Sequence, residues 1–207
     1  MPGINERKRQ WYERSSIVLG RACLKLGLKP NFLTGVSLGC AIVSGICFWR
    51  GEMVWGVVWI LLTSFTDMLD GSTARAGNLG TVFGGILDHV MDRYGEFFIL
   101  AGITLSGRVH PGWGIFALFG MLIASYTRAA AESMGKIENC AVGIMGRLEK
   151  FILIMIGSIL EYFLPTGSWP LGRWLELALI IVGVTSVITA IQRLVYAHRV
   201  LGDRKTV

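Results

Sequence analysis

Long uncharged stretches separated by short charged segments dominate this 207-residue chain. A bilayer core of about 30 Å is crossed by roughly 20 apolar residues in a helix. Six stretches approach that length, and we expect a transmembrane helix in each: residues 30–49, 53–66, 81–106, 109–127, 142–163 and 175–196. The pattern therefore predicts an all-α integral membrane fold with six spans.

A different pattern precedes the first span, where apolar and basic positions recur at helical spacing on separate faces. The apolar positions are Trp11, Val18, Leu19, Ala22 and Leu26, and the basic ones are Arg7, Arg14, Arg21 and Lys25. Such a helix lies in the headgroup layer with its cations toward anionic lipid. We expect an amphipathic interfacial helix over residues 5–28; a soluble cap on the helix bundle is the alternative.

Composition agrees with a membrane protein. Apolar residues make up 53% of the chain and charged residues 16%, against about 25% charged residues in a soluble domain. The mean hydropathy is +0.56. These values exclude a disordered chain and argue against an ordinary soluble enzyme.

The distribution of cations predicts the orientation. Of the 20 Lys and Arg, Arg50, Arg108 and Arg173 fall in connections on one side, and the remaining 17 fall on the side of the termini. Cytoplasmic segments carry the excess of Lys and Arg, so we expect both termini in the cytoplasm of a multi-pass cell-membrane protein. The bilayer thus explains the net charge of +6 better than a nucleic-acid partner does. No internal repeat is evident, which predicts one domain over residues 1–207, ending in a cytoplasmic tail at 197–207.

Four carboxylates form the most informative pattern. On a helix, Asp67, Asp70, Gly71 and Ala74 share one stripe, and Gly84, Asp88 and Asp92 share another. The two stripes end the second span and begin the third, across a short link at residues 76–80. An antiparallel hairpin would bring the four carboxylates together near the cytoplasmic edge of the bilayer.

Four carboxylates at close range repel one another unless cations lie among them. Oxygen donors suit Mg²⁺ or Mn²⁺, and a pair of such ions can clamp the attacking and leaving oxygens of a phosphoryl displacement. Gly71 and Gly84 leave room for a phosphorylated group to approach the backbone. The alternative is that the Asp residues cap helix ends or pair with Arg75 and Arg93.

Residues 67–92 have the form D-x₂-D-G-x₂-A-R-x₈-G-x₃-D-x₃-D, which resembles the signature of the CDP-alcohol phosphatidyltransferase family. The resemblance implies a homodimeric integral enzyme that transfers a phosphatidyl-type group from a CDP-linked lipid to an alcohol and releases CMP. It implies two Mg²⁺ or Mn²⁺ ions held by Asp67, Asp70, Asp88 and Asp92, with Asp92 also the catalytic general base.

The same resemblance implies a site for the CDP-linked lipid, formed by Asn31, Thr34, Gly71, Ala74, Arg75 and Gly84. Residues 30–34 read P-N-F-L-T and are similar to the family's P-N-x-[LV]-T element. A simpler interpretation of this element is a proline at the helix start with a cap from Asn31.

Four further cations lie at the cytoplasmic ends of the last three predicted spans: Arg128, Arg147, Lys150 and Arg193. Together they predict a pocket for an acidic acceptor; routine membrane anchoring is the alternative. The surrounding residues resemble the branch that uses inositol 1-phosphate to make phosphatidylinositol phosphate or its archaeal counterpart. The chain departs from that branch at Ala130, Gly146 and Lys150, which leaves glycerol 3-phosphate and serine open as acceptors.

Two other classes use membrane carboxylates. A divalent-cation channel or carrier would place acidic residues across the membrane core, whereas these Asp residues gather at one face. A membrane prenyltransferase would place its acidic motifs on widely separated helices. Beside the cluster, we expect Glu96 to pair with Arg93 or a neighbouring cation, and His89 to point off the Asp stripe.

Overall fold

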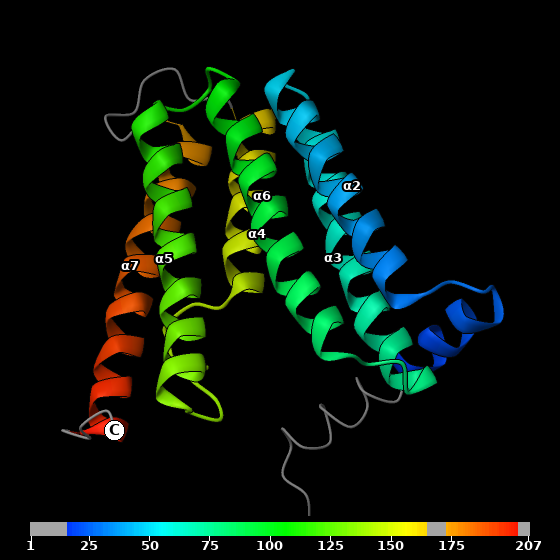
Figure 1. Ribbon diagram of the computed structural model, residues 1–207. Helices are drawn as coiled ribbons and strands as arrows, with labels where there is room; N and C mark the ends of the chain where they lie inside the picture. Colours follow the sequence, from blue (N-terminus) through cyan, green and yellow to red (C-terminus); the bar gives the residue numbers. More distant parts are fainter. Residues whose placement is uncertain (1–15, 165–172, 203–207) are drawn as a thin grey trace, which may run out of the picture. The chain divides into compact units, whose positions relative to one another are not determined.

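The computed structural model describes residues 16–164 and 173–202. In these ranges residues 16–25 are helical, and longer helices follow (Figure 1). Their bounds are α2 Pro30–Trp49, α3 Met53–Gly77, α4 Val82–Leu105, α5 Pro111–Gly135, α6 Arg147–Phe163 and α7 Trp174–Leu201. The chain divides into two compact units, Met1–Ser44 with Val58–Ile99, and Gly45–Val57 with Leu100–Val207.

In the first unit, α2 and the N-terminal helix both pack against α3. The Ser37 hydroxyl on α2 donates to the Thr63 carbonyl on α3 at 3.1 Å. Gly20 lies so close to the Ser72 carbonyl that a Cβ at this position would overlap it. A glycine here therefore allows the N-terminal helix to contact the backbone of α3.

The link between α3 and α4 is short and well defined. Asn78 ends α3 in the left-handed conformation, with φ of 51°, and the Leu79 N–H donates to the Ala74 carbonyl at 2.9 Å. This pairing is the usual way to satisfy the last carbonyls of a helix. Thr81 then caps α4, because its hydroxyl accepts the Gly84 N–H at 2.9 Å. The expected hairpin is thus closed by residues 78–81.

In the second unit, α7 packs against both α5 and α6. Small residues allow the close approach: Gly120 of α5 faces Gly183 of α7, and Gly157 of α6 faces Ala178. Without a hydrophobic driving force between helices, membrane helices associate largely through such close packing. α5 itself begins with Pro111 after the cap His110, whose Nδ1 accepts the Gly112 N–H at 3.1 Å.

The helices follow the predicted spans, with shifted ends. α3 continues past Thr66 to Gly77, and α5 continues past Thr127 to Gly135, because a helix leaving the apolar layer keeps its own backbone hydrogen bonds. α6 begins at Arg147 instead of Val142, since Gly143 adopts φ of 147° and interrupts the helix. α7 extends to Leu201, so residues 197–201 of the predicted tail are helical.

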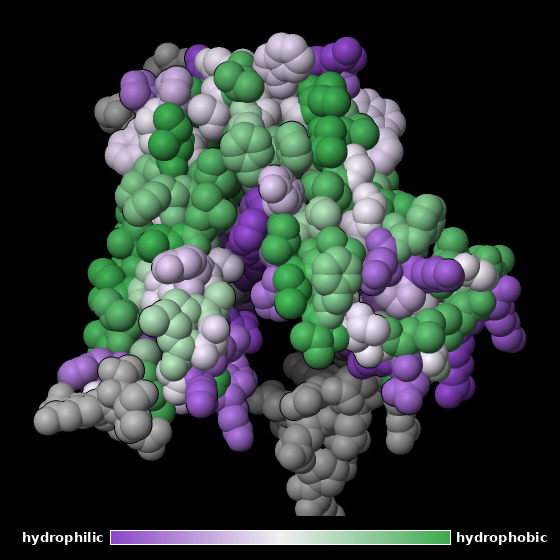
Figure 2. Space-filling model, in the orientation of Figure 1, coloured by the Kyte–Doolittle hydropathy of each residue, from purple (hydrophilic) through white to green (hydrophobic). Residues whose placement is uncertain are grey.

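Among the described residues, four helices are long and apolar enough to cross a membrane: α2, α3, α5 and α7. α6 has only 17 residues, and α4 carries Asp88, Asp92, Arg93 and Glu96 in its sequence. Length and composition thus identify four candidate spans among the described helices, and the number of six spans stays a prediction. Large apolar side chains are exposed on both units, among them Leu61 and Phe65 on α3 and Ile191 on α7. They cover much of the visible surface (Figure 2), as in a membrane-embedded protein.

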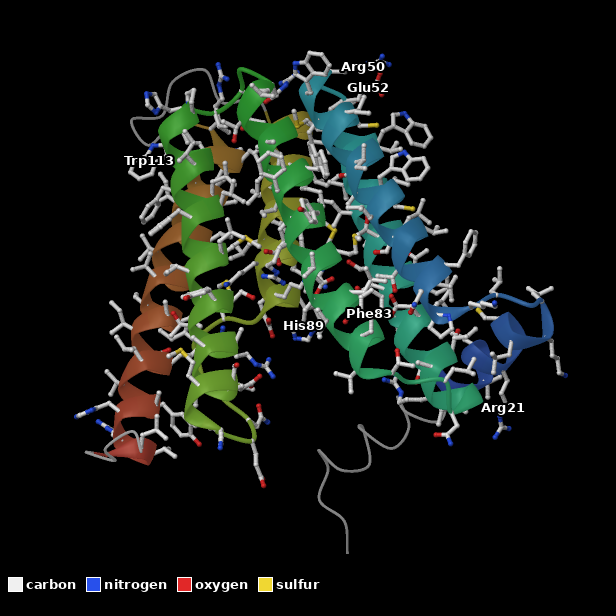
Figure 3. All side chains as sticks on the ribbon, in the orientation of Figure 1. Arg21, Arg50, Glu52, Phe83, His89 and Trp113 are labelled. Atoms are coloured by element: carbon white, nitrogen blue, oxygen red, sulfur yellow. The ribbon has the colours of Figure 1, made fainter. Side chains whose placement is uncertain are left out.

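The N-terminal helix lies only partly within the described residues, which exclude Arg7, Trp11 and Arg14. Val18, Leu19 and Leu26 are exposed, and so is Arg21, which points outward in Figure 3. Ser16, Gly20 and Cys23 form the buried side instead. The predicted apolar face is thus left uncovered by the first unit, and the interfacial location stays a prediction.

We expect Gly120→Ala to destabilise the second unit. The added Cβ would lie 2.9 Å from the Gly183 carbonyl oxygen and 3.1 Å from the Ser186 Cβ, and such overpacking costs about 1–3 kcal/mol. Thermal unfolding of the detergent-purified protein measures the effect. Gly39→Ala is the control, since a Cβ there meets no atom within 4 Å. Equal melting temperatures for the two variants would contradict the α5–α7 packing described here.

Candidate active site

Three carboxylates meet where α3 and α4 face each other. Asp67 and Asp70 come from α3 and Asp88 from α4, and one oxygen of each lies within 4.8 Å of the others. Asp70 is buried, with 6% of its surface exposed, and the other two are half-buried. We call these three residues the carboxylate cluster. Its donors are all oxygens, which fits a hard divalent cation such as Mg²⁺ or Mn²⁺.

Asp92, the fourth predicted member, follows Asp88 one helical turn later on α4. It is outside the group of three within the described part of the chain. Its carboxylate lies 3.7 Å from Arg93 Nη2, and 17% of its side chain is exposed. The hairpin thus assembles three of the four predicted carboxylates directly and places the fourth next along the same helix.

A hydrogen bond connects the cluster to α2. The Thr34 hydroxyl donates to Asp70 Oδ2 at 2.7 Å, and both residues are buried. One turn further along α2, the bond from Ser37 to the Thr63 carbonyl joins the same two helices. Polar contacts therefore fix the start of α2 against the end of α3 beside the cluster.

A cavity of about 250 Å³ opens beside the carboxylate cluster, between the ends of α2, α3 and α4. Asp70 and Asp88 line it, together with every residue predicted for the CDP-linked lipid: Asn31, Thr34, Gly71, Ala74, Arg75 and Gly84. The prediction missed Pro30, Leu79, Gly80, Thr81 and Gly85. Pro30 and Gly85 adjoin Asn31 and Gly84, and the other three belong to the link between α3 and α4, inside the variable spacer of the motif.

The two motif glycines keep this cavity open. A Cβ at Gly84 would lie 3.0 Å from Thr81 Oγ1 and 3.4 Å from Asn31 Oδ1, and one at Gly71 would lie 3.4 Å from Arg75 Nη1. The Arg75 guanidinium therefore lies over Gly71, where it lines the cavity and donates to the Ser72 hydroxyl at 3.4 Å. A cation beside carboxylates and open backbone suits a phosphorylated ligand.

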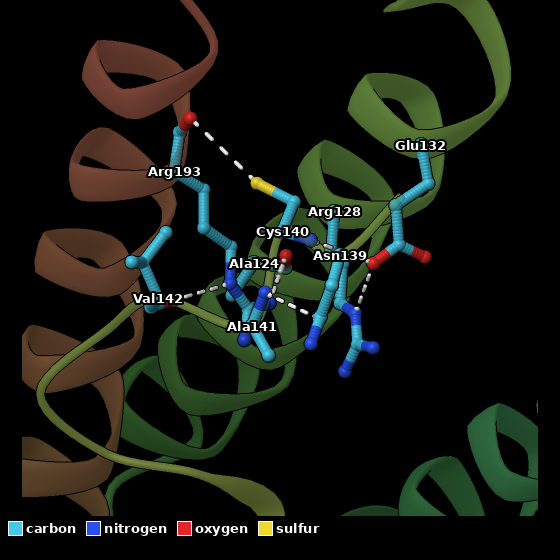
Figure 4. A network of polar contacts seen from close by, with 8 residues as sticks. All are labelled: Ala124, Arg128, Glu132, Asn139, Cys140, Ala141, Val142 and Arg193. Carbon is cyan, nitrogen blue, oxygen red and sulfur yellow. Dashed lines mark hydrogen bonds and ion pairs between the residues drawn. The ribbon is translucent and has the colours of Figure 1, made fainter. Parts of the chain in front are cut away.

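Of the four predicted acceptor cations, Arg128 and Arg193 belong to one polar network in the second unit (Figure 4). Arg128 Nε donates to Glu132 Oε1 at 2.8 Å, and the same oxygen accepts the Cys140 N–H at 3.0 Å. Arg193 donates from Nε to the Val142 carbonyl at 2.9 Å and from Nη1 to the Ala124 carbonyl at 2.6 Å. Arg193 thus ties the loop before α6 to α5, a structural role that the sequence did not indicate.

The other two acceptor cations lie in the first turn of α6. Lys150 is buried, with 5% of its surface exposed. The Arg147 guanidinium carbon lies 5.6 Å from the centre of the Phe151 ring, a stacking that Arg makes readily. Burial of Lys150 is not what a purely superficial membrane anchor would show.

Two neighbouring residues behave as the sequence predicted. Arg93 Nη1 lies 2.8 Å from Glu96 Oε2, and Glu96 is buried, which confirms the expected pair. His89 is 73% exposed and points away from the helix bundle of its unit (Figure 3). Its Nδ1 lies 3.1 Å from the Gly85 carbonyl on its own helix, so His89 is off the Asp stripe.

An all-helical fold with exposed apolar side chains and a carboxylate cluster beside a cavity of about 250 Å³ fits a metal-dependent membrane enzyme that acts on a phosphorylated lipid. Residues 28–198 match the CDP-alcohol phosphatidyltransferase family, and the chain belongs to that family. It is therefore a transferase of phospholipid synthesis, and neither an ion carrier nor a prenyltransferase.

Named relatives refine the comparison. An archaetidylinositol phosphate synthase of Methanothermobacter thermautotrophicus is 38% identical over 164 residues, covering 79% of each chain. A phosphatidylinositol phosphate synthase of Mycolicibacterium smegmatis is 32% identical over 93% of this chain and 88% of its own. The crystal structure of the Mycobacterium tuberculosis phosphatidylinositol phosphate synthase with CDP-DAG bound has a TM-score of 0.79 at 27% identity, covering 94% of this chain and 100% of its own.

We expect Arg193→Lys to lower the stability of the second unit, because an ammonium cannot reproduce two directed N–H bonds to separate carbonyls. Loss of one bond from a charged donor costs about 1.5–3 kcal/mol, measurable as a lower melting temperature in detergent. Arg199→Lys, at an exposed position on the same helix, is the control. An unchanged melting temperature for Arg193→Lys would show that the network in Figure 4 does not stabilise the fold.

Proposed function

We propose that this enzyme transfers a phosphatidyl-type group from a CDP-linked lipid, CDP-diacylglycerol or CDP-archaeol, to inositol 1-phosphate and releases CMP. One observation carries the proposal: the cavity beside the carboxylate cluster is lined by all six residues that the family motif assigns to the CDP-linked lipid. The relatives that are named inositol phosphate synthases support the choice of acceptor.

We assign two Mg²⁺ or Mn²⁺ ions to Asp67, Asp70, Asp88 and Asp92. When bound, such ions neutralise the diphosphate and make CMP a better leaving group. Support comes from the oxygen-only donors of the cluster and from the M. tuberculosis enzyme, whose structure has also been solved in complex with manganese and citrate.

The protein side chains then have distinct tasks. Arg75 contacts the diphosphate, and Asn31, Gly71, Ala74 and Gly84 surround the nucleotide. Asp92 takes the proton from the acceptor hydroxyl, and the resulting oxygen attacks the lipid-side phosphorus in line as the bond to CMP breaks. The position of Asp92 one turn beyond Asp88 supports this division of labour, because a base must reach the acceptor as well as the cluster.

For the membrane arrangement, we propose six spans in a single domain, with both termini and the active site in the cytoplasm and the N-terminal helix in the headgroup layer. At 1.5 Å per residue, α6 is about 26 Å long, close to the thickness of the apolar core. The charges of α4 lie at or before Glu96, which leaves residues 97–105 uncharged. We further propose a homodimer in the cell membrane, as in the resemblance described above.

Asp70→Asn should abolish CMP release from CDP-diacylglycerol, because an amide of the same shape removes a charged donor from the cluster. Chelation of divalent ions with EDTA should also abolish CMP release by the unmodified enzyme, and added Mn²⁺ should restore CMP release. The measurement is CMP production by the purified protein, with size-exclusion chromatography to verify folding. Glu52→Gln, at an exposed position distant in the sequence, is the control. CMP release by Asp70→Asn would show that Asp70 does not belong to the metal site.

We assign the acidic acceptor to Arg128, Arg147, Lys150 and Arg193. The burial of Lys150 supports a pocket, because a cation that only anchors the protein to lipid headgroups would extend to the surface. Two of the four already make strong contacts, Arg128 with Glu132 and Arg193 with backbone carbonyls. Ala130, Gly146 and Lys150 depart from the inositol phosphate branch, so glycerol 3-phosphate and serine are the acceptors to test against it.

Lys150→Gln should raise the KM for inositol 1-phosphate at least tenfold and leave the KM for the CDP-linked lipid within about twofold, because a charged contact to phosphate contributes about 1.5–3 kcal/mol. The rate of CMP release at varied concentrations of the acceptor and of the CDP-linked lipid gives the two KM values. The same assay with inositol 1-phosphate, glycerol 3-phosphate and serine shows which acceptor the enzyme prefers. Lys136→Gln, an exposed cation before α6, is the control. A faster reaction with glycerol 3-phosphate or serine would replace the proposed acceptor.

A further inference from the structure

Thr34 was assigned above, through the family motif, to the site for the CDP-linked lipid, but its hydrogen bond points elsewhere. We propose that Thr34 is a positioning residue, which orients the Asp70 carboxylate for cation binding through its hydroxyl and donates no hydrogen bond to the nucleotide. The proposal rests on the proposed function, since it reassigns one residue of that site.

The number of protons on the hydroxyl decides the assignment. A threonine hydroxyl has one proton to donate, and two acceptors are within reach: Asp70 Oδ2 at 2.7 Å and the Pro30 carbonyl at 3.2 Å. The shorter bond goes to a carboxylate, and hydrogen bonds to charged acceptors are the stronger ones. Phosphate oxygens only accept hydrogen bonds, so a hydroxyl that donates to Asp70 has no proton left for a diphosphate.

Burial makes this bond important for Asp70. Both residues are 6% exposed, and a buried carboxylate without hydrogen-bond partners is costly. The hydroxyl restrains the carboxylate on α3 from the neighbouring helix α2, through a bond that ends on the carboxylate itself. Asp70 is thereby held in one orientation beside Asp67 and Asp88 before any cation arrives.

Partners of this kind orient metal ligands in many proteins, and their loss typically lowers metal affinity about 10- to 100-fold. Thr34 fits that role because its hydroxyl contacts the ligand and its side chain comes from a different helix. By contrast Asn31, one turn earlier on α2, lines the same cavity and approaches Gly84, and it keeps the nucleotide role.

The test compares Mn²⁺ binding by the purified full-length protein, measured by electron paramagnetic resonance of free Mn²⁺ without substrate. Thr34→Val keeps the shape and removes the hydroxyl, and we expect its Mn²⁺ dissociation constant to rise about 10- to 100-fold. Thr34→Ser keeps the hydroxyl and should bind Mn²⁺ within about threefold of the unmodified protein. Ser37→Ala is the matched control: it removes a buried hydrogen bond between the same helices that ends on a backbone carbonyl, and it should bind Mn²⁺ normally.

A second measurement separates the two roles of Thr34. At saturating Mn²⁺, the KM of Thr34→Val for CDP-diacylglycerol should stay within about threefold of the unmodified value. Unchanged Mn²⁺ binding with a raised KM would overturn the proposal and return Thr34 to the nucleotide. If Thr34→Val fails to fold, Thr34→Ser provides the test. A tenfold loss of Mn²⁺ affinity in Thr34→Ser would also overturn the proposal. Because Mn²⁺ binding is measured without turnover, failure of the proposed reaction would leave this result interpretable.

Discussion

Repulsion between like charges is the constraint on which the active-site region depends. Two carboxylates about 5 Å apart repel by roughly 3 kcal/mol at an effective dielectric constant of 20, and three of them lie within such a distance here. Folding must hold them together against this repulsion, and a bound cation then turns the same arrangement into a strong attraction. The Thr34 bond and the capped link before α4 supply that restraint.

The parts of the site that the sequence predicted are those determined by helical periodicity. Asp67 and Asp70 on one stripe and Asp88 on the other meet as expected, because a short link forces consecutive helices to run antiparallel and side by side. The residues for the CDP-linked lipid were instead assigned by the family resemblance, and they line a single cavity although Asn31 and Thr34 come from α2. The Arg93–Glu96 pair likewise follows from i, i+3 spacing on a helix.

Other features depend on backbone geometry, which side-chain patterns do not encode. The bonds of Arg193 end on two carbonyls, and any residue type could supply a carbonyl. The start of α6 at Arg147 depends on the conformations of Gly143 and Gly146, which hydropathy does not detect. Asp92 shares the Asp88 stripe, yet one turn of helix separates it from the three clustered carboxylates, and periodicity places a residue on a face without giving its distance from a partner helix.

The short link between α3 and α4 has a thermodynamic consequence. Residues 78–81 join the two helices, with a left-handed Asn78 and a capping Thr81 fixing both ends of the turn. The chain therefore loses the entropy of bringing Asp88 close to Asp67 and Asp70 when the hairpin forms during folding. Because the loop is short, this loss of entropy is small. Cations can then enter and leave a preassembled ligand set without ordering the chain each time.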